Sequence, residues 1–200
     1  MDRQAHWQGV YASKDETSVS WFQERPATSL ALLECAKPGA RIVDVGGGAS
    51  RLVDHLLERG YDVTVLDIAG AALEKAKARL GEAAAKVRWV TADITRWKSP
   101  APMDVWHDRA VFHFLTEEGD RRAYADAMAA ALPSGGHAVI GTFAADGPER
   151  CSGLPVCRYD AKGLAAQFAA SFRLVDELAE EHRTPGGNVQ RFQFIVLRRL

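Results

Sequence analysis

The sequence has few cysteines and no long hydrophobic run. Its 200 residues include only 3 cysteines, an odd number without the spacing of a disulfide framework. No apolar stretch approaches the roughly 18–20 residues needed to span a bilayer, and the polar first ten residues do not resemble a secretory signal. We therefore expect neither a disulfide-stapled secreted domain nor a membrane protein, and we expect a cytoplasmic location.

The sequence also has no excess of basic residues. It contains 25 Lys and Arg against 26 Asp and Glu, for a net charge of −1. General nucleic-acid binders normally carry a basic face, so we expect no nucleic-acid partner. No internal repeat or low-complexity segment is present, and 47% of the residues are hydrophobic. This length and composition suit one domain with a sizeable core.

What the sequence does have is an alternation of β-branched runs and helical patterns. We expect parallel strands at 41–45, 61–67, 87–91, 105–108 and 137–143, with helices at 50–59, 71–80 and 120–132. A helix over 160–170 precedes two strands, 172–178 and 191–197, with no helix between them, which predicts an antiparallel hairpin. The predicted fold is α/β: a doubly wound, mainly parallel seven-stranded sheet with an antiparallel C-terminal hairpin and helices on both faces.

The strongest candidate site begins where the first strand ends. Asp44 is followed by Gly46, Gly47 and Gly48, and then by a helix. Glycines let the backbone adopt positive φ and approach a ligand closely. A plain strand–helix turn uses the same residues, so this signal alone is weak.

Two further acidic residues strengthen the prediction that the glycine turn belongs to a ligand-binding site. Asp67 ends the second strand about twenty residues later, where a carboxylate can accept both hydroxyls of a ribose. Asp93 ends the third strand and is followed by Ile94, a pair that suits the amine and the face of an adenine. Each acid alone is more often a turn former or a helix cap. Together they lie at the strand ends where open α/β sheets bind ligands.

At this point the sequence resembles the class I S-adenosylmethionine-dependent methyltransferase superfamily, from about Arg41 to the C-terminus. The motifs are Ile-Val-Asp-Val-Gly-Gly-Gly at 42–48, Val-Leu-Asp at 65–67, Thr-Ala-Asp-Ile at 91–94 and Leu-Pro-Ser-Gly-Gly-His at 132–137. Ser50 stands where the family often has a third glycine, a position that varies widely. The resemblance implies a Rossmann-like fold, S-adenosyl-L-methionine as cofactor and S-adenosyl-L-homocysteine as product. The closing hairpin fits this family better than a nucleotide-binding oxidoreductase.

The resemblance also implies roles for the strand-end residues. The methionine part of the cofactor would lie at Asp44 and the glycines, the ribose at Asp67, and the adenine at Asp93 and Ile94. The full set of expected cofactor contacts from the sheet is Asp44, Gly46, Gly47, Gly48, Asp67, Ile68, Asp93, Ile94 and Asp108.

The segment before the first strand contains aromatic and polar residues. We expect residues 1–40 to form a lid and helical segment, with a helix at 26–36, and residues 41–200 to form the cofactor-binding domain. Trp7, Tyr11 and Trp21 are predicted to cover the cofactor, because aromatic faces attract a sulfonium cation. The alternative is a helix that packs on the sheet through ordinary aromatic contacts.

The segment after the fourth strand is the predicted catalytic region. His107, Arg109 and His113 follow the strand end where the transferring methyl group would lie. A histidine titrates near neutrality and could take a proton from the acceptor, and we favour His113. Asp108 and Arg109 could instead form a structural ion pair. Methyl transfer often needs only in-line positioning and no base.

The predicted function is methyl transfer to a small-molecule acceptor. The alternatives are a protein-lysine methyltransferase, a thiol or metalloid methyltransferase, and a non-catalytic cofactor-binding module. The metalloid alternative rests on Cys151 and Cys157 in the long loop 144–159, whose spacing is not that of a zinc site, and we predict no metal. The Asn-Pro-Pro-Tyr type of motif of amino-methylating nucleic-acid enzymes is absent, since the matching segment is His-Asp-Arg-Ala at 107–110.

Overall fold

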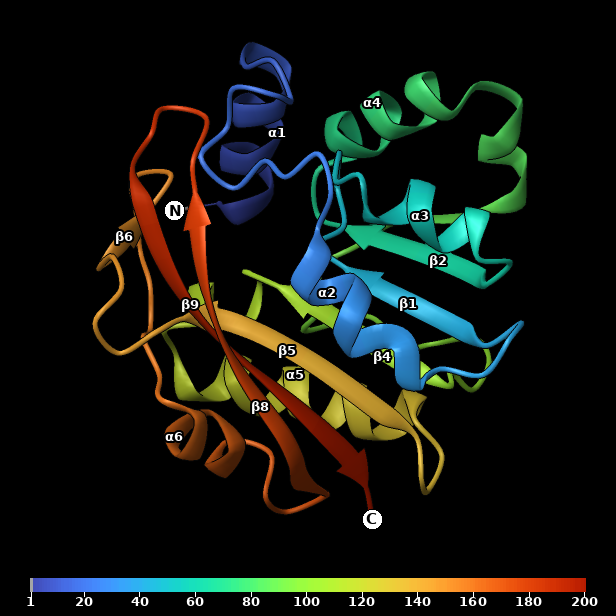
Figure 1. The fold of residues 1–200 in the computed structure, drawn as a ribbon, viewed down its shortest axis with the longest axis vertical. Coiled ribbons are helices and arrows are strands. Elements are labelled where there is room, and N and C mark those ends of the chain that lie inside the picture. The colour runs from blue at the N-terminus through green and yellow to red at the C-terminus, as the bar shows by residue number, and fades with distance from the viewer. Residues whose placement is uncertain (1) are drawn as a thin grey trace.

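The computed structural model describes residues 2–200, and its centre is a seven-stranded sheet (Figure 1). The strand order is β3-β2-β1-β4-β5-β9-β8. The strands are β1 (Arg41–Val45), β2 (Asp62–Asp67), β3 (Arg88–Thr91), β4 (Val105–Arg109), β5 (His137–Phe143), β8 (Phe172–Arg183) and β9 (Val189–Arg199). The first five pair in parallel, while β9 pairs antiparallel with both β5 and β8. The predicted fold class is confirmed.

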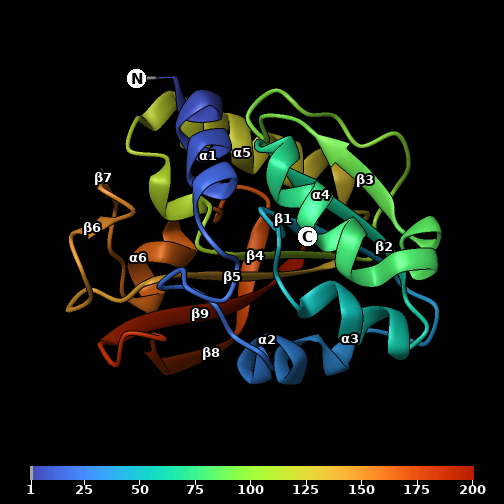
Figure 2. The ribbon, with the colours of Figure 1, turned by 90° about the horizontal axis from the view of Figure 1, so that it is seen from above.

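Helices cover both faces of this sheet, and Figure 2 shows α2 and α3 on the side opposite α5. The α-helices are α1 (Arg3–Ser13), α2 (Ala27–Leu32), α3 (Leu52–Glu58), α4 (Gly70–Leu80), α5 (Glu118–Ala131) and α6 (Ala161–Ala166). Short 3-10 turns are η1 (Leu33–Cys35), η2 (Gly81–Lys86) and η3 (Phe112–Phe114). None of the helices in residues 2–200 is long and apolar enough to cross a membrane.

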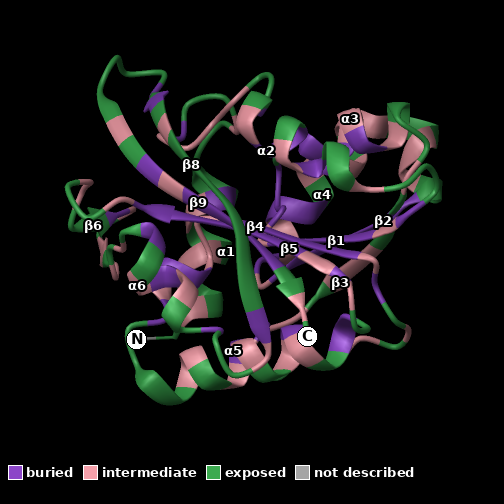
Figure 3. Ribbon diagram, turned by 60° about the horizontal axis from the view of Figure 1, so that its bottom comes forward, coloured by how far each residue is buried: buried purple, intermediate pink, exposed green. Residues whose placement is uncertain are grey.

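Two hydrophobic clusters hold these layers together. Leu33, Leu56 and Leu73 bring η1, α3 and α4 onto one face of the sheet. Tyr124 and Leu164 bring α5 and α6 onto the other. Figure 3 shows the central strands β1, β2, β4 and β5 as mostly buried. Strands covered on both faces read as nearly continuous apolar runs, which is why they are recognisable in the sequence.

The structure differs from the sequence predictions mainly at element boundaries. The predicted helix at 26–36 is α2 followed by the 3-10 turn η1, and the helix predicted over 160–170 ends as α6 at Ala166. The loop 144–159 contains a small two-stranded sheet of β6 (Arg150–Cys151) and β7 (Leu154–Pro155). α1 was expected only as part of a lid segment. Apart from α1, these elements are too short for a periodic pattern of apolar residues to be recognised in the sequence.

The C-terminal hairpin is longer than predicted. Strand β8 extends to Arg183 and β9 begins at Val189, although 180–183 is a charged stretch without an apolar pattern. The strand β8 lies at the sheet edge and most of its residues are exposed, so its length depends on backbone pairing with β9 and not on burial.

Candidate active site

The turn after β1 can be built only with glycine. Gly46 and Gly48 have φ of 69° and 46°, in the left-handed region. A Cβ on Gly46 would collide with Val111, and a Cβ on Gly47 would collide with the Asp44 carboxylate. The backbone of the turn therefore lies directly against Val111, which follows β4, and against the Asp44 carboxylate.

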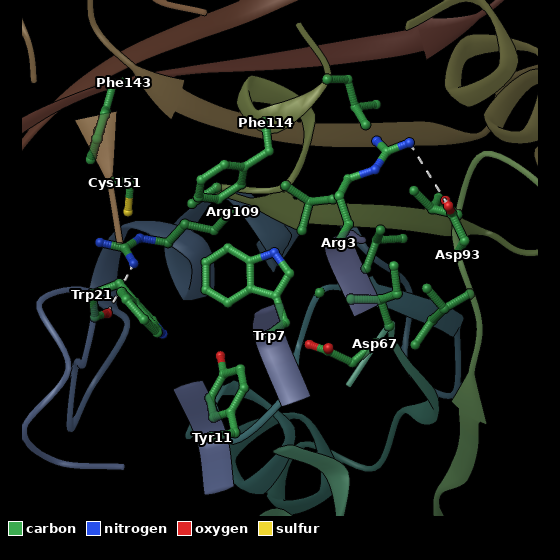
Figure 4. A pocket seen from close by; sticks show the side chains of 18 of the residues that line it. Arg3, Trp7, Tyr11, Trp21, Asp67, Asp93, Arg109, Phe114, Phe143 and Cys151 are labelled. Atoms are coloured by element: carbon green, nitrogen blue, oxygen red, sulfur yellow. Dashed lines mark hydrogen bonds and ion pairs between the residues drawn. The ribbon is translucent and has the colours of Figure 1, made fainter. Parts of the chain in front are cut away.

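A cavity of about 850 Å³ opens beside this turn, at the carboxyl ends of the strands (Figure 4). Residues from α1, from several strand ends and from the C-terminal hairpin surround it. Its lining residues include Arg3, Trp7, Tyr11, Trp21, Gly46, Asp67, Ile68, Asp93, Ile94, Arg109, Val111, Phe114, Phe143, Cys151, Gln190 and Phe192. A smaller neighbouring cavity is lined by Gly47, Asp44 and His107, among others, and shares Tyr11 and Arg109 with the first.

Asp67 is a buried acid at the end of β2 and lies in the cavity wall. Its Oδ1 accepts a hydrogen bond of 2.8 Å from the backbone N–H of Ala69, while Oδ2 lies 2.8 Å from the place where a Cβ of Gly48 would be. Burial, with a smaller contribution from the nearby Asp44 carboxylate, raises the pKa of Asp67 to about 7. This carboxylate is therefore poised to gain from hydrogen bonds donated by a ligand.

Asp44 is held by a buried hydrogen-bonded chain. The parallel register of β1 and β4 places Asp44 opposite His107, and their Oδ1 and Nδ1 atoms are 2.8 Å apart. The other ring nitrogen of His107 lies 2.9 Å from the Ser29 hydroxyl on α2. Among the described residues, Asp44 Oδ2 has no hydrogen-bond partner. One carboxylate oxygen is thus fixed by the protein and the other is left for a further donor.

The end of β3 forms the far wall of the cavity. Asp93 Oδ1 accepts hydrogen bonds from the backbone N–H and the hydroxyl of Thr95, at 2.9 and 2.8 Å. Its other oxygen lies 3.9 Å from Arg3, which also donates to Asp120 at 2.9 Å. Ile68 and Ile94 provide apolar surface beside these groups.

The three predicted lid aromatics meet over the cavity. The ring of Trp7 lies 5.8 Å from that of Trp21 and 6.4 Å from that of Tyr11, and it also contacts Phe114 at 5.0 Å. Tyr11 is buried, and burial and the Asp67 charge raise the pKa of its hydroxyl well above the usual range. The alternative of a helix packed through aromatic contacts is compatible with the same geometry, because α1 both packs on α4 and covers the cavity.

Asp108 faces away from the cavity. Its Oδ1 accepts from the backbone N–H of Val111 at 2.8 Å, and Oδ2 accepts from Phe112 and from the Tyr124 hydroxyl at 3.0 and 2.6 Å. Burial raises the pKa of Asp108 to about 6. These bonds shape the turn that begins η3, and Asp108 is absent from the lining of both cavities described above.

His113 is enclosed behind the cavity wall. The backbone N–H of Phe143 donates to its Nδ1 at 3.3 Å, and its ring packs on Phe114 and Phe143. Burial, and then the charge of Arg109, lower the pKa of His113 to about 3. The imidazole is therefore neutral at physiological pH and does not line the cavity, which argues against the general base we favoured.

Arg109 alone of the three predicted catalytic residues lines the main cavity. Its Nη1 donates to the carbonyl of Trp21 at 3.1 Å, and its guanidinium lies 4.3 Å above the ring of Phe192. The link to Trp21 joins β4 to the lid segment. Predicted His107 lines only the smaller cavity, through its pairing with Asp44.

The two loop cysteines do not form a metal centre. Cys151 lies in the cavity wall and Cys157 is partly buried, and both are free thiols. No cluster of potential metal ligands exists within residues 2–200. Burial raises the pKa of Cys151 to about 11, so the thiol is neutral near pH 7.

Several cavity residues were outside the sequence prediction. Arg3, Phe143 and Phe192 line the cavity, and Ser29 supports Asp44 from outside it. These residues belong to no recognisable motif, and the tertiary fold alone brings them to the strand ends.

The comparisons with known proteins agree with this geometry. The family profile described as "Methyltransferase domain" matches residues 42–136. Nodulation protein S of Rhizobium tropici is 25% identical over 122 residues, which cover 60% of this chain and 51% of that protein. The chain thus spans about half the length of this curated relative.

Two solved structures share the whole fold. The N-methyltransferase NodS from Bradyrhizobium japonicum, in complex with S-adenosyl-L-homocysteine, has a TM-score of 0.76 at 16% identity, with 99% of each chain covered. The 1,6-didemethyltoxoflavin-N1-methyltransferase of Burkholderia thailandensis has a TM-score of 0.72 at 24% identity, covering 98% of this chain and 84% of that one. The glycine turn, the strand order and these matches together show that the chain has the class I, Rossmann-like fold of S-adenosylmethionine-dependent methyltransferases, with a methyltransferase-domain match over residues 42–136.

Proposed function

We propose that this protein is an S-adenosyl-L-methionine-dependent methyltransferase that acts on a small molecule. The observation that carries the proposal is the buried Asp67 carboxylate, which faces a cavity beside a turn that only glycine can form. A carboxylate at the end of the second strand is suited to accept the hydroxyls of a ribose.

The residues present fit the cofactor. Asp67 would accept from the ribose hydroxyls, and Ile68, Asp93 and Ile94 would surround the adenine. The unpartnered Oδ2 of Asp44 would accept from the ammonium of the methionine part, close to Gly46, Gly47 and Gly48. Trp7, Tyr11 and Trp21 would cover the cofactor from above and exclude water.

The protein would act by positioning more than by proton transfer. When bound, S-adenosyl-L-methionine supplies an electrophilic methyl group on a sulfonium, which an acceptor can attack in line. His107 and His113 are both engaged in packing or hydrogen bonds away from the main cavity. We therefore assign them and Asp108 positioning roles, and we assign the contact with the acceptor to Arg109.

The similar proteins favour a small-molecule acceptor. NodS is described as an N-methyltransferase and the Burkholderia protein as an N1-methyltransferase crystallised with 1,6-didemethyltoxoflavin. The cavity beneath α1 extends from the expected cofactor positions at Asp67 and Asp93 to Arg109 and Phe192, which leaves a place for a small acceptor beside the cofactor. A protein-lysine acceptor remains the main alternative, and the free cysteines provide no metal-ligand cluster that would favour a metalloid acceptor.

Isothermal titration with S-adenosyl-L-homocysteine and with NAD tests the cofactor. We expect S-adenosyl-L-homocysteine to bind and NAD not to bind. Absence of S-adenosyl-L-homocysteine binding would overturn the proposal. Transfer of a labelled methyl group into the small-molecule fraction of a lysate, but not into its protein fraction, would identify the acceptor class. The reverse distribution would favour the lysine alternative.

A further inference from the structure

Arg109 is a nearly buried cation whose hydrogen bonding is incomplete. Its side chain is 11% exposed. Nη1 donates to the carbonyl of Trp21, but within residues 2–200 neither Nε nor Nη2 has an acceptor. Each buried donor left unsatisfied is costly, so these two N–H groups are a place where a ligand would gain affinity.

The carboxylate paired with Arg109 does not satisfy these donors. Glu180 Oε2 lies 3.6 Å from Nη2, which is too far for a hydrogen bond, and it has no donor among the described residues. Its other oxygen, Oε1, accepts from Gln23 at 2.8 Å. The pair therefore offsets charge without completing the hydrogen bonds of either ion.

The cavity around Arg109 offers little other charge. The neighbouring lining residues are Phe143, Cys151, Gln190 and Phe192, which are aromatic or neutral. Figure 4 shows the other cavity arginine, Arg3, on the far side of Trp7, where it faces Asp93. Arg109 is therefore the cation on the side of the cavity away from the expected adenine position.

We propose that Arg109 binds a carboxylate carried by the methyl acceptor, so that the acceptor is a small aromatic or otherwise apolar acid. The inference rests on the proposed function, since it concerns the acceptor of that reaction. Nε and Nη2 lie on one edge of the planar guanidinium and match the two oxygens of a carboxylate in a bidentate pair. The apolar part of the acceptor would lie against Phe143 and Phe192.

The same geometry implies that Glu180 competes with the acceptor carboxylate for Arg109. Both unsatisfied nitrogens are enclosed by protein, so an acceptor carboxylate has to displace Glu180 from its loose contact with Arg109. Glu180 would then act as a competing anion. Removing its charge should strengthen the binding of an acid, whereas removing the charge of Arg109 should weaken it.

A fluorine NMR titration tests whether Arg109 binds a carboxylate. The two ligands are 4-fluorobenzoate and the neutral 4-fluorobenzamide, and the protein is saturated with S-adenosyl-L-homocysteine. We expect the acid to bind at least about 10-fold more tightly than the amide, as a charged hydrogen-bonded pair implies. Arg109→Gln should abolish this preference, and Glu180→Gln should increase the affinity for the acid. The matched control is Arg191→Gln, which removes a half-exposed arginine from the same strand as Phe192 and should change nothing.

The outcomes separate this inference from the proposed function. If the acid binds no more tightly than the amide, or does not bind up to its solubility limit, the carboxylate assignment is overturned while cofactor binding stands. If calorimetry shows that S-adenosyl-L-homocysteine does not bind, the proposed function fails. The titration with 4-fluorobenzoate and 4-fluorobenzamide is then carried out on the cofactor-free protein, and the same comparison of acid with amide tests the carboxylate site. Should Arg109→Gln not fold, an unchanged affinity for the acid in Glu180→Gln would also overturn the inference.

Discussion

Two buried carboxylates flank the glycine turn, and the protein holds them differently. Asp44 is fixed through one oxygen by His107, while Asp67 is fixed through one oxygen by a backbone N–H. Burial raises the pKa of Asp67 to about 7, so the folded chain keeps a proton that the unfolded chain releases near pH 4. The free energy of unfolding therefore falls as the pH rises from about 4 to about 7, because Asp67 ionises less readily in the folded chain. Hydrogen bonds donated by a bound ligand would stabilise the ionised carboxylate and offset this loss.

The affinity for cofactor should depend on the ionisation of Asp67. Ribose hydroxyls donate to the ionised carboxylate, so binding below pH 7 requires loss of a proton. We expect S-adenosyl-L-homocysteine to bind up to about 10-fold more weakly at about pH 6 than at about pH 8. Asp67→Asn should weaken binding about 10- to 150-fold and remove this pH dependence. Calorimetry at both pH values measures the affinity of the native protein and of the variant. An unchanged affinity in Asp67→Asn would contradict the ribose assignment.

His107 should matter for stability before it matters for chemistry. It is buried and bridges Asp44 and Ser29, so His107→Ala leaves both partners without a hydrogen bond. We expect a loss of about 1–3 kcal/mol for each unsatisfied buried group in the free energy of unfolding. Ser29→Ala, which removes only the outer partner, should cost less. Urea denaturation measures both variants, and full stability of His107→Ala with lost turnover would restore the catalytic role.

At the scale of elements, α1 is a cover that buries little of its own surface. Among its own residues only Tyr11 is buried, and polar contacts anchor it, from Arg3 to Asp120 and from the Ala71 N–H to Gln8. A helix of this length has little stability by itself in water. Because residues of α1 line the cavity, we expect its attachment to loosen when cofactor enters or leaves.

Bound cofactor should therefore protect the N-terminal segment from proteolysis. We expect cleavage before Pro26 to slow when S-adenosyl-L-homocysteine is present, because the ligand adds contacts to the covering aromatics. Trp7→Ala should reduce this protection without changing the cleavage of the sheet domain. Limited proteolysis followed by mass spectrometry measures the rates. Equal rates with and without ligand would show that α1 is not a lid.

At the scale of the whole molecule, residues 2–40 contact two different parts of the structure. α1 covers the cavity, whereas α2 and η1 bury Leu30 and Leu33 in the same cluster as Leu56 of α3. The second part belongs to the layer that covers the sheet. We therefore propose that the boundary between lid and domain lies near Pro26, not at residue 40.

Shortened chains test this boundary. A chain that begins at Pro26 should unfold cooperatively in urea but bind S-adenosyl-L-homocysteine more weakly. A chain that begins at Arg41 also loses two fully buried leucines, each worth about 2–5 kcal/mol by comparison with core truncations. That total approaches the stability of a typical domain, so we expect it not to fold. Cooperative unfolding of the shorter chain would place the boundary at 40 after all.

The sequence by itself determined the seven strands of the main sheet, their order along the chain and which candidate residues stand at their ends. The β-branched runs of β1 and β2, the glycines at 46–48 and Asp67 are local signals, since backbone conformation and strand ends depend on neighbouring residues. The sequence does not show which face of the sheet each β4 side chain lies on. Side chains alternate along a strand, so Asp108 turns to Tyr124 on one face while His107 turns to Ser29, 78 residues away in sequence, on the other. Only the packing of the helical layers on the sheet decides which side chains form a cavity wall and which belong to the core. For that reason only the tertiary structure shows that Arg109 lines the main cavity and that His107 and His113 do not.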